Sequence, residues 1–182
     1  MAVQTLAQII GAIAIAENAL IYISNRRERI LLFKFLSDAL WLVNYLLMGG
    51  CTGAVLNGVA MVREAVFSQR GKRPWASAKW ILPLFLTLTW VSPALEWIRN
   101  GAISWLPVLP TIGSMIFVLG FYSESTLLTK TTSILGNVLW LLYALLIKNY
   151  TGMLSNVLML LSAVVGIVHQ RRERRADAAK TP

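Results

Sequence analysis

One stretch of the sequence occurs twice and decides the fold. Residues 36–57 read LSDALWLVNYLLMGGCTGAVLN, and residues 135–156, which lie 99 positions later, read LGNVLWLLYALLIKNYTGMLSN. Nine of the 22 aligned positions are identical without a gap. The shared leucines carry little weight, because apolar segments resemble each other by composition. A tryptophan, a Thr-Gly pair and an asparagine in the same register are much harder to obtain by chance. The chain is therefore an internal duplication, and we expect its functional site between the two copies.

The composition is that of a membrane protein. Hydrophobic residues make up 57% of the 182 positions and charged residues 14%, and chains of this kind cross lipid as helices of roughly 20 residues. A single cysteine, Cys51, excludes an intramolecular disulfide framework and a multi-cysteine metal site. The first 24 residues contain no Lys or Arg, and Glu17 interrupts their apolar run. We therefore expect a retained helix there rather than a cleaved signal peptide.

Seven apolar segments can be drawn along the chain: 4–24, 30–48, 51–68, 79–97, 103–122, 127–147 and 150–169. Very short connections join segments two and three and segments six and seven, so the members of each pair are antiparallel neighbours. The fourth segment has no partner 99 positions away. The predicted architecture is an all-α polytopic protein of three helices, one linker helix and three helices. Its predicted units are a first repeat at 1–70, a basic loop and linker helix at 71–101, a second repeat at 102–170, and a basic tail at 171–182.

The basic residues predict the orientation of the chain in the membrane. Fourteen Lys and Arg residues fall on one side of the predicted segments, against Arg99 and Lys148 on the other. Lys and Arg favour cytoplasmic loops, so the N-terminus is expected outside and the C-terminus in the cytoplasm. The basic runs at 26–29 and 171–175 are interpreted as this orientation signal and as a contact for anionic lipids. Nucleic acid is the weighed alternative partner and is not expected.

Two local motifs resemble a known family. CTGAVLNG at 51–58, followed by Arg63 and Glu64, and YTGMLSN at 150–156 resemble the YgjV family of bacterial inner membrane proteins over about residues 5–170. The helix order also resembles the SWEET and PQ-loop (MtN3-type) transporters, which have two parallel three-helix units joined by a linker helix. The resemblance implies a multi-pass protein of a bacterial inner membrane that binds or passes a small polar solute.

The SWEET resemblance nominates a substrate-binding set. SWEETs hydrogen-bond their substrate with an asparagine in the third helix of each repeat, where Asn57 and Asn156 lie here. Their pocket is also lined by the second helix of each repeat, where the candidates are Trp41, Trp140, Asp38 and Asn137. This sequence departs from the SWEET pattern in its prolines. Pro107 and Pro110 lie in the fifth segment, and segments one, two and six contain none.

Each nominated residue type also has a purely structural interpretation. A buried amide has donors and acceptors enough to recognise a hydroxyl-rich solute, but it can equally join two membrane helices for about 0.6 kcal/mol. An indole ring can stack on a sugar, but it can also pack in the core with its N–H bonded to a nearby hydroxyl. The Thr-Gly pairs at 52–53 and 151–152 are expected to cap the third helix of each repeat.

Four charged residues are predicted inside the membrane in the first repeat only. Glu17, Asp38, Arg63 and Glu64 have uncharged equivalents in the second repeat: Ile116, Asn137, Ser162 and Ala163. Charges at such depth face inward and pair. Neighbouring residues on a helix point in different directions, so Arg63 is expected to pair with Asp38 or Glu17 rather than with Glu64. Two roles remain open for this network: it fixes the first bundle or a cytoplasmic gate, or its excess carboxylate carries a proton that drives uptake.

The remaining sequence favours no enzyme. His169 is the only histidine, and it is either solvated or part of a proton relay. No cluster of metal ligands, cofactor motif or nucleophile–base arrangement is visible, so no metal, cofactor or catalytic residue is expected. The predicted function is binding or passage of a small polar solute such as a sugar. The alternative is a receptor or scaffold of the same fold, with an intramembrane enzyme as a weaker third class. The expected partners are the solute, the bilayer and a second copy of the chain in a homo-oligomer.

Overall fold

The described part of the chain folds into helices. The computed structural model describes residues 2–48, 51–146, 148 and 150–178, and these residues form no strand. The all-α prediction is confirmed. The elements are α1 (Ala2–Asn18), α2 (Arg27–Leu47), α3 (Cys51–Ser68), the 3-10 helix η1 (Pro74–Ser77), α4 (Ile81–Leu88), α5 (Val91–Asn100), α6 (Val108–Tyr122), α7 (Thr126–Leu146) and α8 (Tyr150–Ala178).

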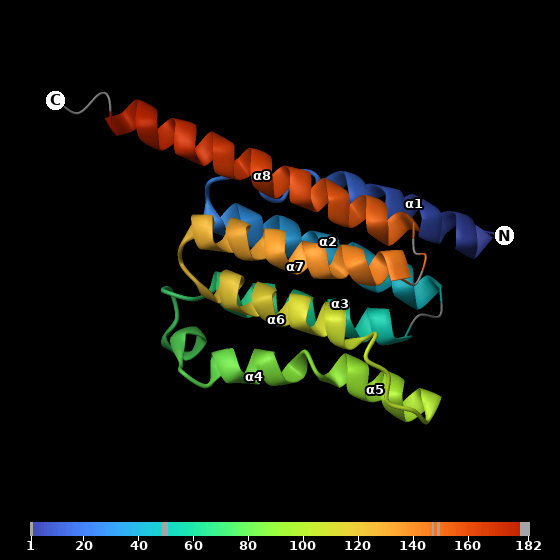
Figure 1. Ribbon diagram of the computed structural model, residues 1–182. Helices are drawn as coiled ribbons and strands as arrows, with labels where there is room; N and C mark the ends of the chain where they lie inside the picture. Colours follow the sequence, from blue (N-terminus) through green and yellow to red (C-terminus); the bar gives the residue numbers. More distant parts are fainter. Residues whose placement is uncertain (1, 49–50, 147, 149, 179–182) are drawn as a thin grey trace.

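The helices run side by side along one direction, and the chain passes back and forth along it (Figure 1). The α1–α2, α3–α4 and α6–α7 connections lie at one end together with the last turns of α8; we call this the basic end. The start of α1, the last turns of α2, α5 and α7 and the first turns of α3, α6 and α8 lie at the opposite end. Among the described residues, three stretches are long and apolar enough to cross a membrane: α2, α4 with α5, and α8. The apolar helix α6 is shorter.

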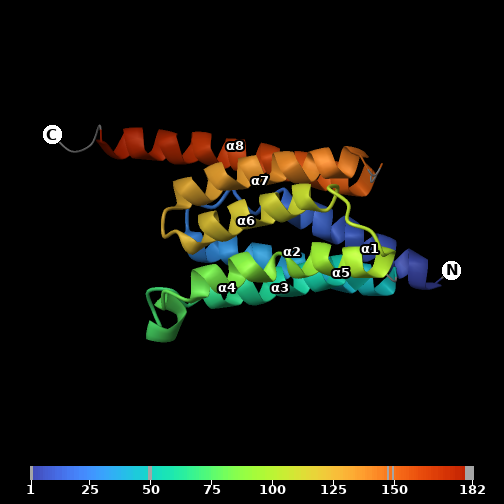
Figure 2. The same ribbon diagram turned by 60° about the horizontal axis from the view of Figure 1, so that its bottom comes forward.

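The duplication is visible in the helix boundaries. Moved by 99 positions, α2 (27–47) coincides with α7 (126–146), and the first residue of α3 coincides with that of α8. In the first repeat α2 packs against α1 and α3, and in the second α7 packs against α6 and α8. Figure 2 shows the two groups, which touch through α1 with α8 and through α3 with α6. Helix α4 packs against α6, and α5 packs against α3 and α6.

Helix α1 ends earlier than the predicted segment 4–24, and a polar contact explains why. The Asn18 side chain donates a hydrogen bond to Ser155 Oγ (2.7 Å) and accepts one from Ser37 Oγ (2.5 Å). The backbone N–H of Tyr22 then donates to Ser162 Oγ at 3.1 Å instead of to an α-helical carbonyl. The bonds of Asn18 to Ser155 and of Tyr22 to Ser162, both on α8, turn the chain after Asn18. The apolar composition of this stretch would by itself predict that the helix continues.

Two prolines set the boundaries of the predicted fourth and fifth segments. The fourth is broken between α4 and α5, because Pro93 has no N–H to donate to the carbonyl of Thr89. The Trp90 N–H forms a tight turn there with the Thr87 carbonyl (3.0 Å). The fifth segment becomes helical at Val108 rather than at 103, directly after Pro107. The residue before a proline disfavours helix, whereas a proline in the first turn is tolerated.

The described part of the predicted basic tail at 171–182 is helical, since α8 continues to Ala178. Its Arg, Glu and Ala residues are good helix formers. The basic segment therefore projects from the bundle as the end of a 29-residue helix (Figure 1).

Candidate functional site

A cavity of about 280 Å³ lies between the two repeats. Residues of α1, α2, α3, α5, α6, α7 and α8 line it. All six nominated substrate-binding residues, Asp38, Trp41, Asn57, Asn137, Trp140 and Asn156, are on its wall. The duplicated register therefore brings three equivalent pairs of side chains to one space.

The side-chain amides of the second-repeat asparagines donate to their own helices. Asn137 Nδ2 donates to the Ser133 carbonyl and Asn156 Nδ2 to the Gly152 carbonyl, both at 2.7 Å and both one turn back on the same helix. Other amides join helices: Asn44 Nδ2 donates to the Ala7 carbonyl of α1 (2.7 Å), and Asn18 bonds Ser155 of α8 and Ser37 of α2. The bonds made by Asn137 and Asn156 orient each amide against its own helix at the cavity wall.

Two aromatic pairs, one from each repeat, form parts of the wall. Trp41 and Tyr45 of α2 have ring centroids 6.0 Å apart, and Trp140 and Tyr143 of α7 have centroids 6.1 Å apart. The indole Nε1 of Trp140 is buried and has no hydrogen-bond partner among the described residues. Both tyrosines line the cavity and were missed in the sequence. The sequence could have indicated them, because each tyrosine follows its tryptophan by one helical turn and so lies on the same face of the helix.

The charged residues deeper in the bundle pair differently from the prediction. Lys34 Nζ donates to Asp38 Oδ1 one turn along α2. Arg63 donates to Glu64 Oε1 from Nε (3.1 Å) and from Nη2 (2.5 Å). The predicted pairing of Arg63 with Asp38 or Glu17 is therefore wrong.

The physical reason is the reach of the side chains. Adjacent Cβ atoms diverge, but the Arg63 side chain is long enough to fold back to the carboxylate of Glu64. Its guanidinium carbon also lies 5.3 Å from the centre of the Phe121 ring, so it packs on an aromatic face of α6. Lys34 was counted among the fourteen basic residues on the predicted cytoplasmic side, yet it is 8% exposed and lines the cavity. It takes the carboxylate that the prediction gave to Arg63.

The four predicted intramembrane charges do not all reach the cavity. Asp38 and Arg63 line it, whereas Glu17 and Glu64 are not on its wall. Glu17 lies close enough to Asp38 and Lys34 for their charges to act on it. Glu64 is fully buried, and its Oε2 accepts no hydrogen bond from the described residues.

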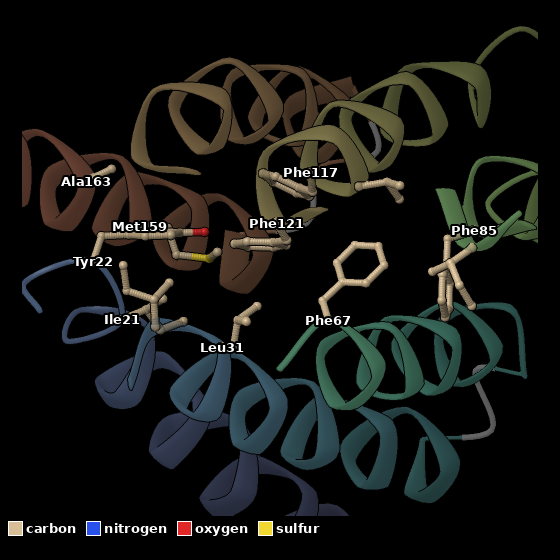
Figure 3. Close-up of a cluster of buried hydrophobic side chains, with 12 residues drawn as sticks. Ile21, Tyr22, Leu31, Phe67, Phe85, Phe117, Phe121, Met159 and Ala163 are labelled. Carbon is tan, nitrogen blue, oxygen red and sulfur yellow. The ribbon is translucent and has the colours of Figure 1, made fainter. Parts of the chain in front are cut away.

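An apolar cluster closes the cavity toward the basic end. Figure 3 shows its aromatic members, including Phe67, Phe117 and Phe121, between the two repeats. Phe117 and Met159 belong both to the cluster and to the cavity wall. On each of four helices the wall residues end where the cluster begins; on α3, for example, Arg63 lines the cavity and Phe67 lies in the cluster. At the opposite end the wall includes Glu96 of α5, Pro107 before α6 and Gly152 in the first turn of α8, so the cavity reaches that end.

Two cations tie the repeats together beyond this cluster. Arg27 of α2 donates to the carbonyls of Phe67 (3.0 Å), Phe121 (2.8 Å) and Ser123 (2.8 Å), which terminate α3 and α6. Lys130 of α7 donates to the Gly166 carbonyl of α8 (3.0 Å) and to Asn25 Oδ1 before α2 (2.6 Å). Phe67 and Gly166 are 99 positions apart. Each repeat thus uses a cation of its second helix to bind the equivalent carbonyl of its third helix and to reach the other repeat.

The remaining candidate residues lie away from the cavity. The His169 side chain is 54% exposed near the basic end, where its Nε2 lies 3.0 Å from Glu173 Oε1. The side chains of Thr52 and Gly53 lie outside the description, and Thr151 is the second residue of α8 rather than its cap. No three His, Cys, Asp or Glu residues converge as metal ligands within the described ranges.

Comparison with known proteins identifies the family. A family model described as Imp-YgjV, bacterial inner membrane protein, matches residues 5–174. The chain belongs to this family. Imp-YgjV membership and the apolar helices establish a protein of the bacterial inner membrane, and they confirm the YgjV resemblance. No curated protein and no solved structure matches the chain significantly.

Proposed function

We propose that the chain binds a small polar solute in the cavity between its repeats and passes it across the inner membrane. The observation that carries the proposal is the symmetric lining: Trp41 with Trp140 and Asn57 with Asn156 meet in one cavity from equivalent positions of the two copies. A volume of about 280 Å³ is close to the lower end of the ligand-binding range, about 300 Å³. In this proposal the chain is a transport protein and not an enzyme.

The closure of the cavity supports passage. A transporter of this kind exposes its site to one side of the membrane at a time. Here the wall extends to the opposite end, and the apolar cluster with the Arg27 and Lys130 contacts closes the basic end. We assign this arrangement to an outward-facing state of a SWEET-like transporter with seven spans in the order three, one, three. The basic end is then cytoplasmic and the N-terminus periplasmic.

A receptor or scaffold of the same fold is the second candidate function. The absence of prolines from the sequence of α1, α2 and α7 favours it, because SWEETs place hinge prolines in the corresponding helices. A receptor needs the cavity but no opening at the basic end.

The proton-coupled form of transport would use the excess carboxylate among Glu17, Asp38 and Glu64.

A binding screen followed by uptake tests the proposal. Purified protein in detergent is scanned for thermal stabilisation by sugars, sugar acids and amino acids, and the best ligand is then offered to proteoliposomes. We expect a ligand whose stabilisation is lost in Asn156→Leu and Trp41→Ala but kept in Trp75→Phe, an exposed tryptophan of η1. Binding with uptake supports a transporter, and binding without uptake supports a receptor. The absence of any stabilising ligand among these classes and small amines contradicts both.

A further inference from the structure

The charges around the cavity are unbalanced, although the chain as a whole carries a net charge of +9. Two cations, Lys34 and Arg63, line it. Each has a carboxylate partner, Asp38 and Glu64 respectively. One further carboxylate, Glu96, is on the wall. It has no ion pair within the described part of the chain. With Glu64 counted as the partner of Arg63, three carboxylates face two cations, which is a formal surplus of one negative charge.

Asp38 supplies an acceptor that nothing in the described chain uses. The residue is 2% exposed and lies on the cavity wall. Its Oδ1 accepts from Lys34, while its buried Oδ2 accepts no hydrogen bond from the described residues. A buried carboxylate oxygen without a donor is costly, so a ligand that donates to it gains more than an ordinary hydrogen bond.

The wall beside Asp38 favours a positive charge. Trp41 follows Asp38 by three residues on α2, and Trp140 follows its equivalent, Asn137, by three residues on α7. Tyr45 and Tyr143 complete the aromatic surface. Aromatic faces attract cations, and tryptophan does so most strongly. A neutral sugar would also stack on these rings, so it is the surplus of carboxylates that distinguishes the two kinds of solute.

We propose that the solute is a small protonated amine that donates to Asp38 Oδ2 and packs its positive charge against the rings of Trp41 and Trp140. Lys34 and Arg63 remain paired with Asp38 and Glu64, so their positive charges are neutralised and repel the amine only weakly. This inference rests on the proposed function and names the chemical class of its solute. The surplus negative charge and the unused carboxylate oxygen then serve the ligand.

Four probes separate charge from hydrogen bonding in a calorimetric titration of the purified full-length protein. Butylammonium carries a charge and N–H donors, butanol a donor without charge, tetramethylammonium a charge without a donor, and glucose neither charge nor an apolar chain. Butylamine is protonated at pH 7, as a lysine side chain is. We expect butylammonium to bind at least tenfold more tightly than butanol, and tetramethylammonium to fall between the two.

Variants assign that preference to the site. Asp38→Asn should bring butylammonium within about threefold of butanol, a loss of most of the tenfold preference. Because Asp38→Asn leaves Lys34 unpaired, the same titration is also made with the double variant Lys34→Met/Asp38→Asn. A separate variant, Glu96→Gln, should weaken butylammonium binding severalfold. Glu124→Gln, an exposed carboxylate away from the cavity, should leave the affinity unchanged.

The outcomes distinguish this inference from the proposed function. Equal affinity for butylammonium and butanol overturns the amine assignment, and so does an amine preference that survives in the folded Lys34→Met/Asp38→Asn and Glu96→Gln variants. Binding of glucose without butylammonium also overturns it, but leaves solute binding in place. If none of the four probes binds, and no sugar acid or amino acid does, the proposed function fails as well.

Discussion

At the residue scale, the pair of Lys34 and Asp38 makes the sharpest stability prediction. Their side chains are 10% and 3% exposed. Asp38→Asn removes the partner of a buried ammonium, and breaking such a pair costs about 3–5 kcal/mol. We expect a large fall in the free energy of unfolding, measured by denaturant titration in detergent. The double variant Lys34→Met with Asp38→Asn should recover most of it, because no buried charge is then left alone.

A matched pair on the surface provides the control. Glu28 and Lys72 form a 2.7 Å ion pair with side chains 69% and 54% exposed. Exposed pairs of this kind contribute little to stability, so Glu28→Gln should unfold at the same denaturant concentration as the wild type. A double variant at positions 34 and 38 that is as unstable as Asp38→Asn would show that the aspartate, and not the pairing, supports the fold.

The lining of the cavity was predictable where the two copies agree. Trp41, Trp140, Asn57 and Asn156 could be found because a repeated register marks positions that meet at a shared interface. Lys34 could not be found this way, since its equivalent is Ser133 and its charge was counted only as part of the orientation signal. The partner of Arg63 was missed because helical angles give the direction of Cβ and not the reach of a guanidinium.

At the element scale, the crossing of α8 over the α1–α2 connection depends on Gly166. A Cβ at Gly166 would lie 1.9 Å from the backbone oxygen of Tyr22. That oxygen belongs to the main chain and cannot move like the end of a flexible side chain. Gly166→Ala should therefore destabilise the protein by about 1–3 kcal/mol, the usual cost of overpacking. Gly58→Ala in α3, whose Cβ meets only Leu42 at 4.0 Å, should be tolerated in the same denaturant titration. Equal stability of the two variants would show that α8 adjusts freely there.

The closure of the basic end makes a second prediction at this scale. Arg27→Gln and Lys130→Met each remove bonds between the repeats, so the basic end should open more often. The opening is measured at a cysteine introduced by Met159→Cys, where the cavity meets the apolar cluster. The background is Cys51→Ser, so that the introduced cysteine is the one that reacts. We expect a membrane-impermeant thiol reagent to label it faster in inside-out vesicles once either cation is replaced. Lys72→Met, a cation of the same end outside these contacts, should leave the rate unchanged. If labelling is unaltered in both Arg27→Gln and Lys130→Met, these contacts do not keep the basic end closed.

The course of the helices could be predicted from apolar runs, but their interruptions could not. The segment 51–68 agrees with α3 at both ends. The end of α1 at Asn18 depends on Ser155, which lies 137 positions away, and such a contact leaves no local signal. The break between α4 and α5 has a local cause in Pro93, but a proline only shows where a helix is weakened. The tertiary contacts decide whether it bends or breaks.

At the scale of the whole molecule, the two halves of the bundle have different properties along its length. The half near the opposite end contains the cavity, and the half near the basic end contains the apolar cluster and the bonds of Arg27 and Lys130. The repeats are parallel copies, so the same polar positions of each contribute to the cavity and the same carbonyl of each third helix is bound at the closed end. The duplication thus supplies both the site and its closure from one helical unit.

The orientation of this polarised bundle is the last prediction. The sequence places fourteen Lys and Arg residues on one side of its predicted segments, against Arg99 and Lys148 on the other. Even without Lys34, which is buried at the cavity, this excess favours retention of that side in the cytoplasm. A fluorescent protein that folds only in the cytoplasm should be bright when fused after Pro182 or inserted after Gly71. Alkaline phosphatase, which is active only outside the cytoplasm, should be active when inserted after Gly101 and inactive after Gly71. Both glycines lie in exposed connections with positive φ, so the insertions are matched in local structure. An active phosphatase after Gly71 would reverse the orientation, and the closed end would then face the periplasm.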